Sequence, residues 1–439
     1  MFFYYLRLGA MSVQRHPLLT GLMLAAIAIG IGACMTVVTI YHVMSGNPIP
    51  HKSDQLYYVQ LDNWNPHEPN NDYGLPPDQL TYRDATTLLA AAKARRQVVS
   101  YQIGHILEPE SDEQRPFQVE GRATSADFFA MFDVPFRYGG GWDQAADDGR
   151  ERVAVIRRSI SERLFGERNP VGDRIRMNGD FYRITGVLDE WDPVPRFYDL
   201  TTSEFNNSAD VFIPFNVAVE KELSGWGNTN CWKQVEEPGW EGFLNSECVW
   251  MQMWVELHGD AEVADYQSYL DAYVAEQKAL GRFPRPMNNL LSPVAQHLKQ
   301  QRVVDESVYI LLVLALLFLM VCLLNTIGLL LAKVMRRSGE ISLRRAVGAS
   351  RGNVFTQYVV EAGLIGFVGG LLGIGATKLG LYGIDRLYTG DESIQKLLQM
   401  NWTMVWAAIL LAVISAVTAA IYPTWRVSRI QPASQLKTL

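Results

Sequence analysis

The sequence predicts an α+β membrane protein. One N-terminal and three C-terminal transmembrane helices are expected, with a large two-part α+β domain inserted between the first and second. Two observations lead to this fold class: long apolar stretches lie at both ends of the 439-residue chain, and a polar, acidic stretch separates them. The averages, 48% apolar residues and a net charge of −7, hide this division. An apolar content this high excludes a disordered chain.

Four stretches are candidates for crossing a membrane, since a helix needs roughly 20 apolar residues to span the hydrocarbon core. Asp, Glu, Lys, Arg and His are absent from 18–41, 308–332 and 402–423. The fourth stretch, 354–380, carries Glu361 near its start and Lys378 near its end. We expect it to span as well, because charged side chains near helix ends can reach the interface.

The first stretch can also be interpreted as a secretion signal, because Arg7 and Arg15 precede it. Its length exceeds the roughly 7–15 residues of a signal's apolar region. Residues 31–34 resemble a lipoprotein cleavage box. A packing face of small residues within a span is favoured over that alternative, because apolar residues continue from Cys34 to Tyr41.

Basic residues place both ends of the chain in the cytoplasm, because short cytoplasmic loops are rich in Lys and Arg. The loop between the second and third spans has six such residues and one acid, Glu340. The segment 45–307 carries 25 basic and 41 acidic residues. We therefore expect a multi-pass protein of the bacterial inner membrane, with a periplasmic domain, lipid as a partner and no nucleic-acid partner.

These signals divide the chain into nine segments. The membrane spans are expected at 18–44, 308–334, 354–385 and 402–423. The segments outside the membrane are an amphipathic interfacial helix at 1–17, the periplasmic domain at 45–307, a basic cytoplasmic helix at 335–353, a short periplasmic loop at 386–401 and a cytoplasmic tail at 424–439. For 1–17, a frayed tail is the less favoured alternative.

Two features of the spans concern helix packing. Overlapping Gly-x-x-x-Gly pairs in the third span predict close approach of another helix, without deciding whether it belongs to the same chain: Gly366, Gly369, Gly370 and Gly373. In the second span, we expect Asn325 to form an interhelical hydrogen bond rather than to line a transport path.

Short alternating segments in the periplasmic domain predict strands at 55–61, 152–156, 180–187 and 250–257. Helical stretches interleave with them at 77–92, 159–165 and 261–280. Asn178-Gly179 between two short apolar runs predicts a tight hairpin.

Cys231 and Cys248 are the only cysteines outside the spans and lie 17 positions apart. An oxidising compartment favours a disulfide between them, with two free buried thiols as the alternative. The bond would tie a loop rich in tryptophan. We interpret these residues first as core and second as a ligand platform: Trp226, Trp232, Trp240, Trp250 and Trp254.

Motifs for catalysis are missing. The sequence contains no phosphate-binding loop and no nucleophile elbow, and its seven histidines have no metal-ligand spacing. We therefore predict no catalytic residue, no metal site and no cofactor in this chain.

Three stretches resemble one family. The first, Gly-Glu-Ile-Ser-Leu-Arg-Arg-Ala-Val-Gly-Ala-Ser-Arg-Gly-Asn-Val at 339–354, resembles the signature loop of FtsX-like permeases, the membrane subunits of MacB-type ABC transporters. Ser342 stands where the family favours glycine. Residues 422–432 are similar to the family's C-terminal end, and the series beginning at 124–135 is similar to the MacB-type periplasmic core domain.

The resemblance implies mechanotransmission, in which a dimeric cytoplasmic ABC ATPase binds ATP and Mg²⁺ and moves the spans. It also implies that the periplasmic domain has a membrane-near part at 48–122 and 210–305 and an inserted tip at 123–209. Only about 17 residues precede the first span, so we expect the ATPase to be a separate polypeptide.

Docking to that ATPase is expected through the cytoplasmic helix, although the same arginines could serve only to orient the protein in the membrane. Gly348 would end this helix and Ser350 would cap the next one. The polar contacts would come from Glu340, Arg344, Arg345 and Arg351, and the apolar seat from Ile341, Ala346 and Val347.

The resemblance does not name a substrate. A second copy of the chain or a sister permease is expected as partner. Efflux through a periplasmic adaptor protein and an outer-membrane channel is the leading hypothesis. Lipoprotein extraction and signal relay to a periplasmic effector are the alternatives.

Overall fold

The computed structural model describes residues 17–109, 115–202, 204–336, 347–387 and 402–428, and a few single residues outside these ranges. The chain forms two compact units. We call Gly46–Val303 the insert domain, and Met1–Ser45 with Val304–Leu439 the helical unit. The predicted interfacial helix at 1–17 lies almost entirely outside the described residues, as do most of the loop at 386–401 and the end of the tail at 424–439.

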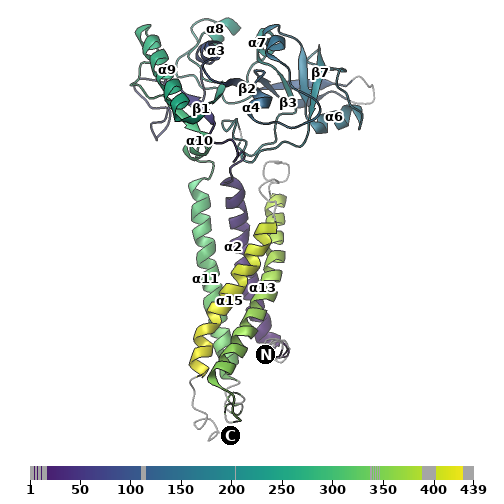
Figure 1. Cartoon of the computed structure of the whole chain (residues 1–439), viewed down its shortest axis with the longest axis vertical. Coiled ribbons are helices and arrows are strands. Elements are labelled where there is room, and N and C mark those ends of the chain that lie inside the picture. Colours follow the sequence, from purple (N-terminus) through teal and green to yellow (C-terminus); the bar gives the residue numbers. More distant parts are fainter. Residues whose placement is uncertain are drawn as a thin grey trace. The chain divides into compact units, whose positions relative to one another are not determined.

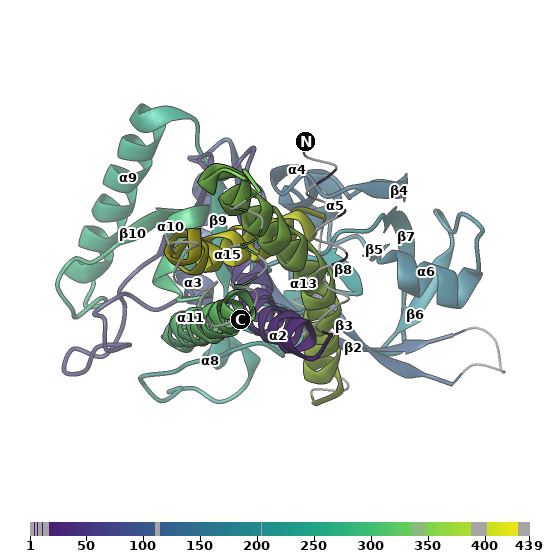
Figure 2. The same ribbon diagram turned by 90° about the horizontal axis from the view of Figure 1, so that it is seen from below.

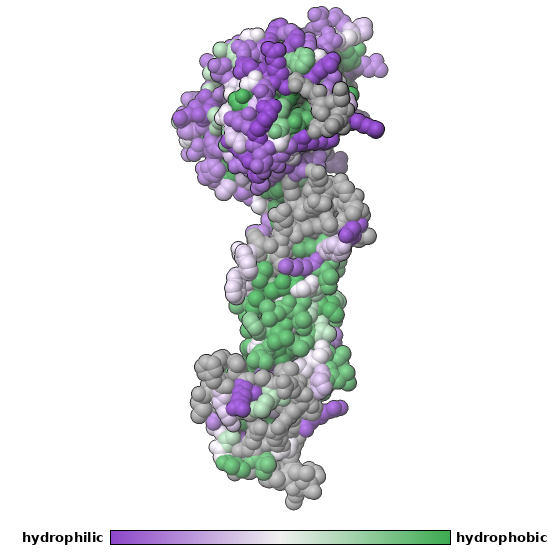
Figure 3. All heavy atoms as spheres, turned by 90° about the vertical axis from the view of Figure 1, so that its right-hand side faces the viewer, coloured by the Kyte–Doolittle hydropathy of each residue, from purple (hydrophilic) through white to green (hydrophobic). Residues whose placement is uncertain are grey.

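The helical unit is a bundle of long helices (Figure 1). They are α2 (Pro17–Met44), α11 (Glu306–Met335), α13 (Arg351–Leu387) and α15 (Trp402–Ser428). Within the described part of the chain, these are the four helices long and apolar enough to cross a membrane. The face seen in Figure 3 carries a band of apolar residues along them. The predicted arrangement of one N-terminal and three C-terminal spans is confirmed.

Within the bundle, α13 packs against both α2 and α15, and α11 packs mainly against α2 (Figure 2). The core is formed by small and apolar side chains such as Ile27 and Ile31 of α2 and Ala408 and Ala412 of α15. The third span is longer than predicted. It begins at Arg351 because the hydroxyl of Ser350 accepts a hydrogen bond from the backbone N–H of Asn353 (3.1 Å) and caps the helix.

The insert domain is built on one ten-stranded mixed sheet with the order β10-β1-β9-β2-β3-β8-β5-β7-β4, and β6 pairs with both β2 and β7. Its strands are β1 (Leu56–Gln60), β2 (Arg96–Glu108), β3 (Phe117–Thr124), β4 (Phe136–Gly139), β5 (Val153–Ile156), β6 (Arg174–Met177), β7 (Asp180–Leu188), β8 (Val211–Pro214), β9 (Gln252–Glu256) and β10 (Leu290–Pro293). Apolar clusters cover both faces of this sheet.

Eight helices accompany the sheet among the described residues of the insert domain. They are α3 (Tyr82–Ala91), α4 (Phe128–Met131), α5 (Gln144–Asp148), α6 (Arg158–Phe165), α7 (Phe215–Glu220), α8 (Trp240–Leu244), α9 (Gly259–Ala279) and α10 (Val294–Gln300). The prediction that the first of them starts near residue 77 is wrong. It starts at Tyr82, because the side chain of Thr81 accepts a hydrogen bond from the N–H of Asp84 and caps the helix there.

The hairpin predicted at Asn178-Gly179 is confirmed, and it joins β6 to β7. Both residues have positive φ, +48° and +84°, as a two-residue turn of this type requires. Asn178 also accepts a hydrogen bond from the N–H of Ile106 in β2 (2.8 Å), which fixes the hairpin against the neighbouring strand.

The predicted division of the insert domain into two parts does not interrupt the sheet. Strand β8, at the expected boundary near residue 210, pairs with β3 on one side and β5 on the other. One apolar cluster contains Phe128 and Val155 from the predicted tip together with Leu56 and Trp254 from the predicted membrane-near part. A membrane-near part and an inserted tip therefore share one sheet, and their separate identity stays a prediction.

Candidate functional site

The end of the bundle next to residues 336–350 carries the segment predicted to contact an ATPase. Val334 of α11, Ile341 of the segment, and Val354 and Tyr358 of α13 form one buried apolar cluster. We call it the seat cluster. It packs Ile341 of the segment directly against two spans.

This arrangement differs from the predicted role of Ile341. The residue is 6% exposed and packs against its own chain, so that its side chain is unavailable to an ATPase in this structure. By contrast, Val347 is 82% exposed and Leu343 is 57% exposed. Leu343 was missed by the sequence analysis, although it lies four residues before Val347 and would share a helix face with it.

The polar residues of the segment are described only in part. Glu340, Arg344 and Ala346 lie outside the described residues. Arg345 is half-buried and Arg351 is exposed. The predicted helix end is confirmed: the N–H groups of Val347 and Gly348 donate to the carbonyls of Leu343 and Arg345, and Gly348 has φ +109°.

A charged pair is buried beside the seat cluster. Lys333 Nζ of α11 lies 2.6 Å from Glu361 Oε1 of α13, and the two side chains are 1% and 2% exposed. The same ammonium group lies 3.4 Å from the hydroxyl oxygen of Thr20 in α2. The expectation that Glu361 reaches the membrane interface is therefore wrong, because its charge is balanced inside the bundle. Lys378 is exposed.

The glycines of α13 pack on two sides. A side-chain carbon at Gly366 would lie 2.7 Å from Cβ of Ala416, and one at Gly370 would lie 2.9 Å from Cβ of Ala412, both in α15. Gly369 and Gly373 face Ile27 and Ile31 of α2 at 2.8 and 2.9 Å. The overlapping pairs thus serve two interfaces inside one chain.

Asn325 does not behave as expected. It lies exposed on α11, and no hydrogen bond joins it to another described residue. The expected interhelical hydrogen bond is therefore not formed with any helix that the structure describes, and one with a helix of another chain stays a prediction.

Cys231 and Cys248 are joined by a disulfide in the insert domain. Trp250 and Trp254 are buried in the core, as the first interpretation predicts, whereas Trp226 is 47% exposed. A role as ligand platform stays a prediction. Trp226 covers Gly104 of β2, where any side chain would collide with the indole ring.

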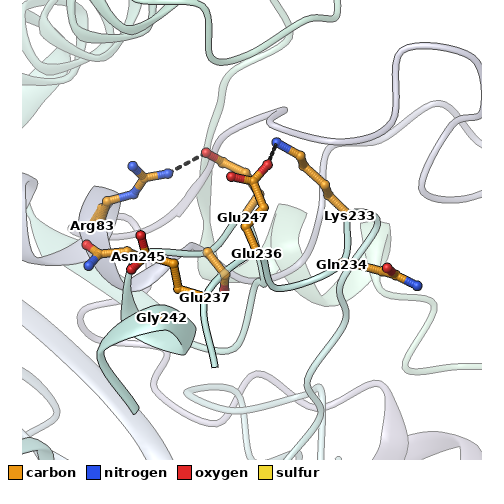
Figure 4. Close-up of a pocket in the computed structure, with 9 residues that line it drawn as sticks. Arg83, Lys233, Gln234, Glu236, Glu237, Gly242, Asn245 and Glu247 are labelled. Atoms are coloured by element: carbon orange, nitrogen blue, oxygen red, sulfur yellow. Dashed lines mark hydrogen bonds and ion pairs between the residues drawn. The ribbon is translucent and has the colours of Figure 1, made fainter. Parts of the chain in front are cut away.

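A polar cavity of about 420 Å³ lies next to this disulfide loop (Figure 4). Two ion pairs line it, Arg83 with Glu247 and Lys233 with Glu236, each at 2.5 Å. Burial would raise the pKa of Glu247, but hydrogen bonds and charges from Arg282, Asn63 and Arg83 hold it below its ordinary value. The cavity therefore offers a structural charge network rather than an acid–base pair poised for catalysis.

Two family models match the chain. The model described as MacB-like periplasmic core domain matches residues 20–273, and the model described as FtsX-like permease C-terminal matches residues 312–432. The chain belongs to the FtsX-like permeases with a MacB-like periplasmic core domain. The series of motifs quoted from the sequence lies inside these two matches.

Relatives of this FtsX-like permease include an uncharacterized ABC transporter permease, YknZ, of Bacillus subtilis, 22% identical over 98% of either chain. A macrolide export ATP-binding/permease protein, MacB, of Rhodopirellula baltica is 24% identical over 65% of this chain and 40% of its own length. The pyoverdine export protein PvdT of Pseudomonas syringae is 23% identical over 70% of this chain and 41% of its own. The chain thus spans about two-fifths of the ATP-binding relatives.

Among solved structures, the chain is similar to the periplasmic region of MacB from Actinobacillus actinomycetemcomitans. The match covers 57% of this chain and 94% of the MacB chain. The TM-score is 0.38 and the identity 13%.

Proposed function

We propose that this chain is the permease subunit of an ABC exporter, in which ATP hydrolysis by a separate ATPase subunit drives motion of the insert domain. The seat cluster is the observation that carries the proposal. It fixes the segment 336–350 to α11 and α13, so that a force applied to the segment reaches the spans. α11 follows the insert domain directly in sequence.

The separate ATPase is supported by the names of the relatives. YknZ, which matches over 98% of its length, is named a permease. The relatives named ATP-binding/permease are matched over about two-fifths of theirs. ATP and Mg²⁺ would therefore be bound by the partner, a dimer in the cytoplasm, and this chain would supply the docking segment.

The proposed docking face combines exposed residues of the segment with residues that the sequence alone places there. Leu343 and Val347 offer the apolar contact in place of Ile341, and Arg351 lies exposed at the start of α13. Glu340, Arg344, Arg345 and Ala346 complete the proposed face. Gly348 sets its end.

Efflux is the favoured direction of work, because the ATP-binding relatives are named for the export of macrolides and pyoverdine. The chain would sit in the inner membrane with both termini in the cytoplasm. A second permease copy or a sister permease, a periplasmic adaptor and an outer-membrane channel would complete the assembly. Lipoprotein extraction and signal relay stay alternatives.

Co-purification with the ABC-type ATPase of the same genome neighbourhood tests the proposal. Leu343→Asp with Val347→Asp should abolish association and leave membrane insertion intact, because two carboxylates would be buried in the docking face. Leu280→Asp, on a leucine 71% exposed in the insert domain, is the matched control and should bind normally. Unchanged binding of the double variant would reject the docking face. ATP hydrolysis by the purified permease alone would reject the division of labour.

A further inference from the structure

Lys333 and Glu361 are the two charged side chains that are fully buried in the described part of the long helices. Ionisable residues inside a membrane bundle are costly, and their positions usually have a functional cause. A buried ion pair is rarely needed for stability, because apolar residues of similar volume often replace it without loss. Stability of the bundle therefore does not by itself explain why this pair is present.

Its surroundings indicate what that role is. Lys333 directly precedes Val334, and Glu361 lies one turn after Tyr358, so the pair and the seat cluster occupy adjacent layers of the bundle. The hydroxyl of Thr20 brings a third helix to the same ammonium group. One charged group is thus shared by α2, α11 and α13.

The interface between α2 and α13 is closely packed. It is formed largely by small residues, with Gly369 and Gly373 against isoleucines of α2, and Gly32 of α2 against Ala376. Small residues allow the backbones to approach closely, and these isoleucines fill the space above the two glycines. Sliding of one helix along the other would have to disrupt this packing and also separate any charged pair that joins the helices. A short ion pair in a low-dielectric interior resists such sliding strongly, because its energy falls steeply with distance.

We propose that Lys333, Glu361 and Thr20 form a polar clamp that makes the ends of α2, α11 and α13 move as one body with the segment 336–350. α2 precedes the insert domain in sequence and α11 follows it. A displacement of the segment then reaches both chain connections of the insert domain together. This inference rests on the proposed function and adds the residues that transmit the motion.

The test distinguishes the effect of the charges of Lys333 and Glu361 from the effect of the volume of their side chains. Lys333→Met with Glu361→Leu removes both charges and keeps apolar volume, whereas Lys333→Glu with Glu361→Lys inverts the pair and keeps the attraction. Lys378→Met is the control, since it removes an exposed charge from the same helix. Each full-length variant is reconstituted in nanodiscs with the ATPase and checked by thermal unfolding. A spin label at Leu280→Cys of two permease copies reports the distance change on adding ATP and vanadate.

The apolar double variant should fold and bind the ATPase. Its change in spin-label distance on adding ATP and vanadate should be roughly fivefold or more smaller than that of the unmodified chain. The inverted pair should recover most of it, and the control should match the unmodified chain. A full response from the apolar variant would overturn the clamp, and so would an inverted pair as inactive as the apolar one. If the unmodified chain binds no ATPase or shows no response to ATP, the proposed function fails first, and the clamp fails with it.

Discussion

Asp199 lies fully buried in the insert domain between Arg122 and Arg196, which are each 1% exposed. Burial would raise the pKa of its carboxyl group, but the two guanidinium groups and a hydrogen bond from Thr201 lower it to about 2. The carboxylate is thus the charge that allows both arginines to be buried.

Replacing Asp199 with Ala should lower the free energy of unfolding by about 3–5 kcal/mol. It removes the carboxylate that pairs with Arg122 and leaves Arg196 with only Glu120, at 4.0 Å, as an acidic partner among the described residues. Asp133→Ala is the control. That carboxylate pairs with His51 and Lys52 but is 45% exposed, so the loss should stay below about 1 kcal/mol. Chemical unfolding of the purified chain, followed by tryptophan fluorescence, measures both. Equal losses would show that Asp199 is not the essential partner.

His105 provides a pH-dependent contribution to stability. Burial between β2 and its neighbours lowers its pKa from 6.5 to about 4. At pH 7 the imidazole is mainly neutral in both the folded and the unfolded chain, so proton binding changes the free energy of unfolding little at that pH. As the pH falls below 6.5, the unfolded chain binds a proton that the folded chain does not, and the folded state loses up to about 3 kcal/mol by pH 4.

His105→Gln should therefore reduce the loss of stability between pH 7 and pH 4.5, because it removes the proton uptake and can still accept the hydrogen bond from Asn178. His67→Gln, on an exposed loop residue, is the matched control and should leave the pH dependence unchanged. Thermal unfolding at both pH values measures the difference. An unchanged pH dependence in His105→Gln would contradict the prediction.

Single residues were predicted unevenly from the sequence. Gly348 and Ser350 could be predicted because caps depend on neighbouring backbone groups. The pairing of Lys333 with Glu361 could not, because they lie 28 positions apart on two different helices, and hydropathy treats each as a charge near a span end. The orientation of Ile341 into its own bundle was missed for the same reason.

At the scale of elements, α13 is constrained by its glycines. A methyl group at Gly366 would lie 2.7 Å from Cβ of Ala416 and 2.9 Å from the carbonyl oxygen of Ala412. Gly366→Ala should therefore force α13 away from α15 and destabilise the bundle by about 1–3 kcal/mol.

Gly375→Ala is the matched control for this prediction. It lies in the same helix, but nothing lies within 4 Å of the added carbon. It should be neutral or slightly stabilising, since alanine restricts the unfolded chain more than glycine does. Thermal stability in detergent compares the two variants. An equal effect would show that the α13–α15 contact tolerates a wider spacing.

The loop closed by Cys231 and Cys248 is a second element with a measurable contribution. A disulfide closing a loop of this length stabilises the folded state by about 3 kcal/mol, mainly by restricting the unfolded chain. Cys231→Ser with Cys248→Ala should lower the free energy of unfolding by that amount. Reductant should lower the stability of the unmodified chain but not that of the double variant. Two alkylatable thiols in the untreated protein would show that the bond does not form.

Elements were predictable where the signal is local. The four spans follow from hydropathy, and the hairpin at 178–179 follows from its turn residues. Strand β2 was missed because it is buried on both faces from Gln97 to Ile103 and so lacks the alternation of a half-exposed strand. Strand β8 was missed as well, because it is four buried residues long and too short for a periodic signal.

At the scale of the whole molecule, the distribution of charge agrees with the division into two units. The segment 45–307 carries 25 basic and 41 acidic residues, whereas the loop between α11 and α13 and the tail after α15 are basic. Basic loops are retained in the cytoplasm during insertion. The charge distribution therefore predicts that the insert domain and the proposed docking segment lie on opposite sides of the membrane.

Accessibility of single cysteines tests this orientation. Val347→Cys and Leu280→Cys each place a thiol at an exposed position, in the docking segment and the insert domain. The native thiols of Cys34 and Cys322 are buried, and those of Cys231 and Cys248 are bonded, so the background should be low. In intact spheroplasts, a membrane-impermeant maleimide should label position 280 at once and position 347 only after the membrane is permeabilised. The reverse order would place the segment outside the cell, where no cytoplasmic ATPase could reach it.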